Sequence, residues 1–186
     1  MPGLLTLARA IDLANEKIGS AVAWFIFAST MISAANAVVR KAFSLSSNSW
    51  LEMQWYLFSA AFLLAAADTL RRNEHVRIDI VYGIWSRRVQ NWIDLFGHIF
   101  FLLPFVLMML WMIYPYAMLS IRSLEYSSNA GGLPLWPAKI PMLIGFVLLT
   151  FQAFSEIIKK IAIIRGELDD PFKPAEEEDA AGGIAA

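Results

Sequence analysis

Two carboxylates, Glu52 and Asp68, stand in an otherwise apolar segment, residues 50–70. A carboxylate in a segment apolar enough to enter a membrane is by default a candidate functional group. The two are 16 residues apart, which is about 24 Å along a helix. They therefore cannot share a proton or a metal ion. Glu52 lies near one boundary of the segment, where Arg40 or Lys41 could pair with it.

Asp68 precedes Arg71 and Arg72 by three and four residues, the spacing at which side chains meet on one face of a helix. We expect a local ion pair there. A second polar group follows directly: Glu74, His75 and Asp79. One histidine and two carboxylates without a recognised metal-binding spacing are a weak sign of a site. We expect this group to pair with the neighbouring arginines and to fix a turn.

The chain has two histidines, His75 and His98, and no cysteine. Ligation of haem by two histidines requires a second axial ligand on a facing helix, and His75 lies outside the apolar segments. The absence of cysteine excludes disulfides, thiolate metal sites and iron–sulfur clusters. We therefore expect no metal ion and no cofactor, and we interpret His98 as a polar contact between helices.

The sequence contains no familiar catalytic motif. It lacks the GxxxxGK[ST] loop that holds nucleotide phosphates and the GxSxG turn of hydrolases. The run 131–137 contains no catalytic group and is typical of a tight turn. Polar residues in the middle of the apolar segments are few, whereas a solute pathway usually shows paired charges or broken helices. We therefore predict that the chain is not an enzyme.

The composition indicates a membrane protein. Of 186 residues, 58% are hydrophobic and 17% are charged, whereas an ordinary soluble domain has about 25% charged residues. A membrane-spanning helix needs about 20 apolar residues. The sequence offers four such runs, at residues 18–39, 50–70, 95–119 and 136–158. Pro104 falls inside the third and is expected to kink it.

Amphipathic and acidic segments flank these runs. Residues 1–17 and about 77–92 place apolar side chains at helical spacing, which predicts two helices lying in the membrane interface. The predicted fold is therefore an all-α integral membrane protein with four transmembrane helices plus interfacial amphipathic helices. Its parts are an interfacial helix at 1–17, a membrane domain at 18–163 and an acidic, disordered tail at 164–186.

The basic residues are distributed unevenly. If the four runs cross the membrane, eleven Lys and Arg residues fall on the side that holds both termini and four fall on the other. The positive-inside rule then places both termini in the cytoplasm. Tryptophans near both predicted boundaries agree with an aromatic belt.

Three stretches in fixed order resemble the small membrane subunit (DctQ type) of tripartite ATP-independent periplasmic (TRAP) transporters. They are EMQWYLF at 52–58, LRRNEHVRID at 70–79 and GLPLWPAKIP at 132–141. The resemblance covers roughly residues 15–160. In the second stretch a glycine is common before the His-Val pair, and this chain has Glu74 there.

The resemblance implies a division of labour in the bacterial inner membrane. A large membrane subunit (DctM type) binds substrate and sodium and moves by an elevator motion, and a periplasmic substrate-binding protein (DctP type) delivers the substrate, typically an organic acid. The small subunit is implied to be the static scaffold of the large one and to help in docking outside. The substrate is chosen by the other two proteins.

The residues that would serve this role fall into three groups. The expected anchors to lipid head groups and the interface are Arg71, Arg72, Arg87, Arg88, Trp85 and Trp92. Structural or subunit contacts are expected from Glu52, Trp55, Asp68, His75 and Asp79. The outer surface for the binding protein is expected within residues 42–52 and 121–139, with Arg122, Glu125, Trp136 and Lys139.

Two other interpretations remain open from the residues alone. One is a self-contained small transporter acting as a homo-oligomer, and the other is a small membrane enzyme or haem protein. Each would need a pathway or a pocket with convergent polar groups.

Overall fold

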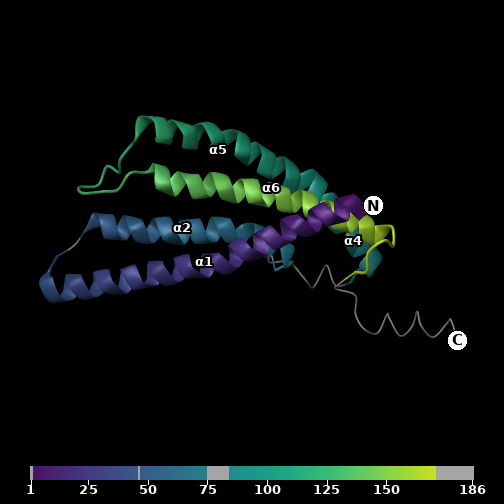
Figure 1. Cartoon of the computed structure of the whole chain (residues 1–186), viewed down its shortest axis with the longest axis horizontal. Coiled ribbons are helices and arrows are strands. Elements are labelled where there is room, and N and C mark those ends of the chain that lie inside the picture. Colours follow the sequence, from purple (N-terminus) through teal and green to yellow (C-terminus); the bar gives the residue numbers. More distant parts are fainter. Residues whose placement is uncertain (1, 46, 75–83, 171–186) are drawn as a thin grey trace.

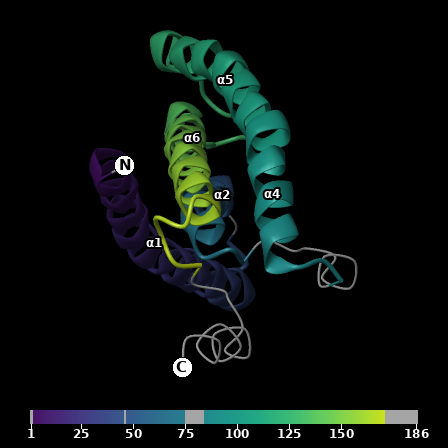
Figure 2. The same ribbon diagram turned by 90° about the vertical axis from the view of Figure 1, so that its right-hand side faces the viewer.

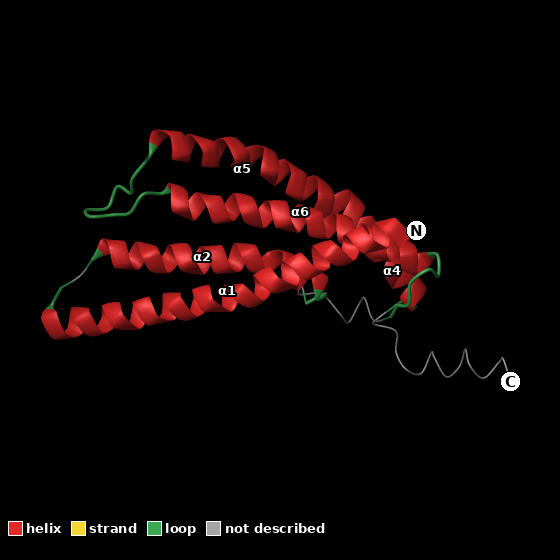
Figure 3. Cartoon of the chain, viewed as in Figure 1, coloured by secondary structure: helices red, strands yellow, loops and turns green. Residues whose placement is uncertain are grey.

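The computed structural model describes residues 2–45, 47–74 and 84–170, and these ranges are helical apart from short connections (Figure 3). Two loop residues, Tyr126 and Pro134, form an isolated antiparallel bridge. The elements in chain order are α1 (Pro2–Phe43), α2 (Asn48–Arg71), α4 (Arg87–Gly97), the π-helical turn η1 (His98–Leu102), α5 (Leu103–Ser123) and α6 (Trp136–Ile164). The predicted all-α class is confirmed for the described part of the chain.

The long helices lie side by side in the order α1, α2, α6 and α5 (Figure 1). The end of α1, the start of α2 and the connection at 124–135 lie at one end of the bundle, which we call the loop end. The N-terminus of α1 and the C-terminus of α6 lie at the other, which we call the terminal end. Figure 2 views this terminal end and shows α1 on one side of α6, with α4 and α5 on the other.

Three helical segments of the described chain, not four, are long and apolar enough to cross a membrane: Gly3–Phe43, Arg87–Ser123 and Trp136–Ile164. The predicted second span, residues 50–70, does form a helix, α2, and is the exception. Its polar side chains, among them Glu52, Gln54 and Asp68, make it less apolar than the others. The prediction of four apolar spans is corrected to three, and α2 packs between α1 and α6.

Helix α1 is continuous from Pro2 to Phe43, so no break separates the predicted interfacial segment 1–17 from the first span. Its buried side chains recur every seven residues: Ala8, Asn15, Val22, Ser29 and Asn36. A seven-residue repeat keeps one face of a helix against its neighbours along its whole length. The first half of α1 is therefore packed by the same stripe that packs the span.

The third predicted span also extends further than expected. Helices α4, η1 and α5 form one helical run, in which the Leu103 N–H donates to the His98 carbonyl five residues back. This π turn directly precedes Pro104, which has no N–H to continue the regular bonding. Part of the predicted interfacial helix, residues 77–83, lies outside the described residues, and from Arg87 onward that segment belongs to the long helical run.

Candidate functional site

Glu52, near the start of α2, fastens the loop 124–135 to that helix. Glu52 as a whole residue is only 4% exposed. It accepts hydrogen bonds from the Ser127 hydroxyl, from the Asn129 side-chain amide at 2.8 Å and from the Leu133 backbone N–H at 2.6 Å. Three donors therefore satisfy this buried charge, in place of the Arg40 or Lys41 partner considered from the sequence.

The same junction is closed by two further contacts. The Asn48 side-chain amide donates to the Ala130 carbonyl at 2.9 Å, and the Ser49 hydroxyl donates to the Gly131 carbonyl. Together with the Glu52 contacts they define the loop clamp. Its partners lie about 80 positions apart in the chain, so sequence spacing could not reveal it.

Two of the predicted docking residues face each other. Lys139 forms an ion pair with Glu125, is only 9% exposed, and its Nζ lies 3.8 Å from the centre of the Tyr116 ring. The Lys139 and Ser120 hydrogen bonds lower the pKa of the Glu125 carboxyl below its usual value. This pair is therefore engaged within the chain, whereas Arg122 is exposed and Trp136 partly so.

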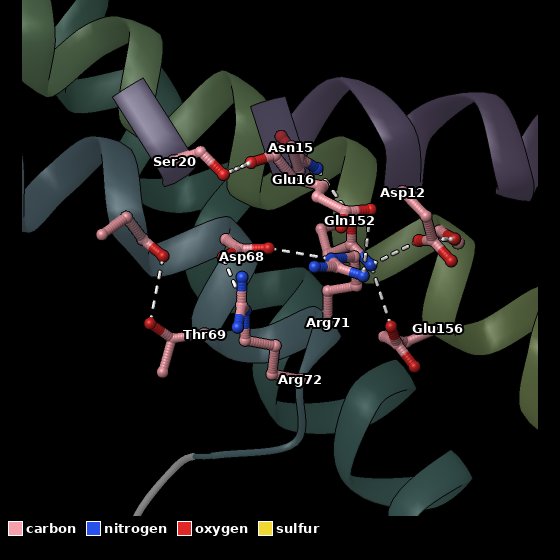
Figure 4. Close-up of polar contacts among 12 residues, drawn as sticks. Asp12, Asn15, Glu16, Ser20, Asp68, Thr69, Arg71, Arg72, Gln152 and Glu156 are labelled. Atoms are coloured by element: carbon pink, nitrogen blue, oxygen red, sulfur yellow. Dashed lines mark hydrogen bonds and ion pairs between the residues drawn. The ribbon is translucent and has the colours of Figure 1, made fainter. Parts of the chain in front are cut away.

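A second polar cluster joins α1 to α6 near the terminal end (Figure 4). Gln152 is fully buried. It accepts from the Asn15 amide at 2.7 Å and donates to Asp12 at 2.8 Å and to Glu156 at 2.9 Å. Lys159 bridges the same two carboxylates, at 2.9 Å from Asp12 and 2.6 Å from Glu156. We call these residues the α1–α6 cluster.

Sequence analysis did not identify the α1–α6 cluster, because its members on the two helices are about 140 positions apart. Two features of the sequence could have indicated it. One is the seven-residue stripe in α1, which contains Asn15, and the other is Gln152 inside the apolar run 136–158. Ser155 extends the cluster by donating to the Asp12 carboxylate at 2.9 Å and to the Ala8 carbonyl at 3.2 Å.

Asp68 lies between Arg71 and Arg72, with both Nε atoms 2.8 Å from its oxygens, as the spacing predicts. Arg71 also approaches Glu16 on α1 at 3.6 Å. Gly19 leaves room for this group, since a Cβ at that position would lie 2.6 Å from an Asp68 carboxylate oxygen. Arg71 therefore links α2 to α1, whereas Arg72 pairs with Asp68 at the end of α2 itself.

A third group of charges joins α4 to α6. Lys160 is 2.7 Å from Asp94 and 2.8 Å from the Asn91 side-chain oxygen. Trp85 and Trp92 are exposed at this end, and Trp55 is exposed in the half of α2 that is nearer the loop end. His98 is buried at the start of the π turn. His75 and Asp79 lie outside the described residues. No group of three or more His, Asp or Glu residues able to hold a metal ion occurs in the part of the chain that the structure describes.

Comparison with known proteins gives one finding. The model of the family described as tripartite ATP-independent periplasmic transporters, DctQ component, matches residues 29–162, which is more than half of the chain. No curated protein and no solved structure matches the chain. The match begins within α1 and ends within α6, so it includes the loop clamp and Gln152 but not Asp12 and Asn15.

Proposed function

Because this chain belongs to the DctQ family of small TRAP transporter subunits, we propose that it acts as a non-catalytic scaffold for a large DctM-type membrane subunit. The large subunit carries out sodium-coupled uptake of an organic acid, and this chain holds its stationary part.

The observation that supports a scaffold is that both ends of the bundle are fastened by buried polar contacts, the loop clamp at one end and the α1–α6 cluster at the other. Such contacts resist sliding of the helices when a neighbour moves. The test is whether the chain retains that partner when purified.

The face of α5 turned away from α6 is the proposed contact with the large subunit. It carries large apolar side chains that no described part of this chain covers, and Trp111 is 84% exposed. Met108 and Met112 are the other exposed members on α5, and Phe101 of the preceding π turn is exposed as well. Because lipid tails are as apolar as these side chains, shape and packing rather than hydrophobicity must select the partner.

We place the protein in the bacterial inner membrane with both termini in the cytoplasm. This orientation requires α2 to cross despite its polar residues. Two features support the crossing: α2 runs the length of the bundle between its two ends (Figure 1), and Glu52 and Asp68 are both buried. A charge turned toward protein partners is tolerated within a membrane helix. The positive-inside count then assigns the terminal end to the cytoplasm.

Single cysteines can test this orientation, since the chain contains none. Leu45→Cys and Arg122→Cys, both exposed at the loop end, should react with a membrane-impermeant maleimide added to spheroplasts. Glu74→Cys and Asp169→Cys, exposed toward the terminal end, should react only after permeabilisation. External labelling of Glu74→Cys at the level of Leu45→Cys would mean that α2 does not cross.

The same cysteines test docking outside the cell. We propose that the DctP-type binding protein contacts the loop end at Arg122 and Trp136, with the Glu125–Lys139 pair shaping that surface from within. Adding the binding protein should slow labelling of Arg122→Cys. Labelling of Asp169→Cys, measured as a control in permeabilised spheroplasts, should not change. Equal labelling rates at Arg122→Cys with and without the binding protein would place the docking surface elsewhere.

A further inference from the structure

Three arginines surround a cavity at the terminal end of the bundle. The cavity, of about 470 Å³, lies between α4 and the end of α6. Its polar lining consists of Arg87, Arg88, Asn91, Arg165 and Asp170. Ile163 and Ile164 form its apolar side. We call it the arginine pocket. Three cations face one carboxylate in its lining, so the pocket carries an excess of positive charge.

Asp170 shows what kind of group the pocket accepts. Its carboxylate receives hydrogen bonds from Arg87 Nη2 at 3.1 and 3.2 Å and from the Asn91 side-chain amide at 3.0 Å. Arg87 is itself oriented by Gln90, to whose side-chain oxygen its Nη1 donates at 2.6 Å. A carboxylate is thus already bound here by a guanidinium, which Gln90 orients, and by a side-chain amide.

Donors remain after Asp170 is bound. The Arg87 Nε is buried and has no hydrogen-bond partner. Arg88 and Arg165 form no ion pair with the described residues, in contrast to Arg71 and Arg72, which share Asp68. Guanidinium groups bind phosphate with the same two-pronged geometry as carboxylate, and phosphate offers more oxygens and more charge.

We infer that the arginine pocket binds a phosphate group, and that Asp170 is a built-in competitor for it. The phosphate would be held by Arg87, Arg88 and Arg165 with help from Asn91, and its arrival would displace the Asp170 carboxylate. The source is a phospholipid head group or a small soluble phosphate ester. The lipid source rests on the proposed placement of this end at the cytoplasmic membrane surface, and the isoleucines beside the pocket suit an acyl chain.

The test is native mass spectrometry of the full-length chain in detergent, titrated with dioleoylphosphatidylglycerol. Dioleoylglycerol, which has the same acyl chains without phosphate, and glycerol 3-phosphate, which has the phosphate without chains, are titrated in parallel. The double variant Arg88→Gln/Arg165→Gln should weaken phosphatidylglycerol binding by about tenfold or more. Asp170→Asn should strengthen it by about tenfold, because the competing charge is removed. Arg40→Gln, an exposed arginine in the last turn of α1 at the opposite end of the bundle, is the matched control and should leave lipid binding unchanged.

The outcomes separate the possibilities. Binding of phosphatidylglycerol but not glycerol 3-phosphate, sensitive to both changes, supports a lipid head group, whereas equal sensitivity with glycerol 3-phosphate supports a soluble ester. Equal binding of dioleoylglycerol, or no response to the pocket variants, overturns the inference. Because the chain is assayed by itself, failure here does not depend on whether it binds the large subunit.

Discussion

Replacing Gly145 with alanine is expected to push α2 away from α6 and to destabilise the bundle by about 1–3 kcal/mol. A Cβ at this position would lie 2.6 Å from the Leu63 carbonyl oxygen and 2.9 Å from its carbonyl carbon. These atoms belong to the backbone of α2, which cannot rotate out of the way as a side chain could. Close approach of two helices at a glycine is also the packing that membrane bundles favour.

The matched control for this change is Gly97→Ala, near the end of α4. A Cβ there would meet nothing within 4 Å, and alanine is the better helix former. Thermal unfolding of both variants in the same detergent compares the two positions directly. Unfolding midpoints that fall equally, or fall only for Gly97→Ala, would contradict the packing of α2 on α6 described above.

Gln152→Leu should be about as damaging, with an expected loss of about 2–4 kcal/mol. Leucine fills much of the same volume but removes the acceptor for Asn15 and the donor for Asp12, both at the buried junction of α1 with α6. The cost arises because groups that stay buried lose a partner, not because one hydrogen bond is lost. We expect the first half of α1 to detach from α6.

Thr150→Val is the control for this variant. Thr150 is also buried on α6, but its hydroxyl donates to the Phe146 carbonyl of its own helix at 2.7 Å. Removing it should therefore cost little. Hydrogen–deuterium exchange of residues 8–20 is the readout, with faster exchange in Gln152→Leu than in Thr150→Val. Equal protection in the two variants would mean that the α1–α6 cluster does not hold α1.

The sequence allows the helices to be predicted because apolar periodicity is a local property. The pairing of Asp68 with Arg71 and Arg72 is local in the same way. The contacts of Glu52 and Gln152 are not, since their partners lie 75 to 140 positions away and depend on how the helices pack. The break expected after residue 17 is absent because packing of the seven-residue stripe outweighs the change in polarity. The second predicted span, residues 50–70, forms a helix but is not among the three most apolar ones, because its polar side chains, among them Glu52, Gln54 and Asp68, lower its mean hydropathy.

Co-purification tests the scaffold role most directly. The chain is tagged at its C-terminus, extracted from its native membrane in mild detergent, and analysed by mass spectrometry, with the Gly145→Ala variant processed in parallel. The scaffold role predicts a far larger polytopic membrane protein in stoichiometric amount with the wild-type chain, and less of it with the variant. A wild-type chain that purifies by itself, as a homo-oligomer with no larger membrane protein, would contradict the scaffold role.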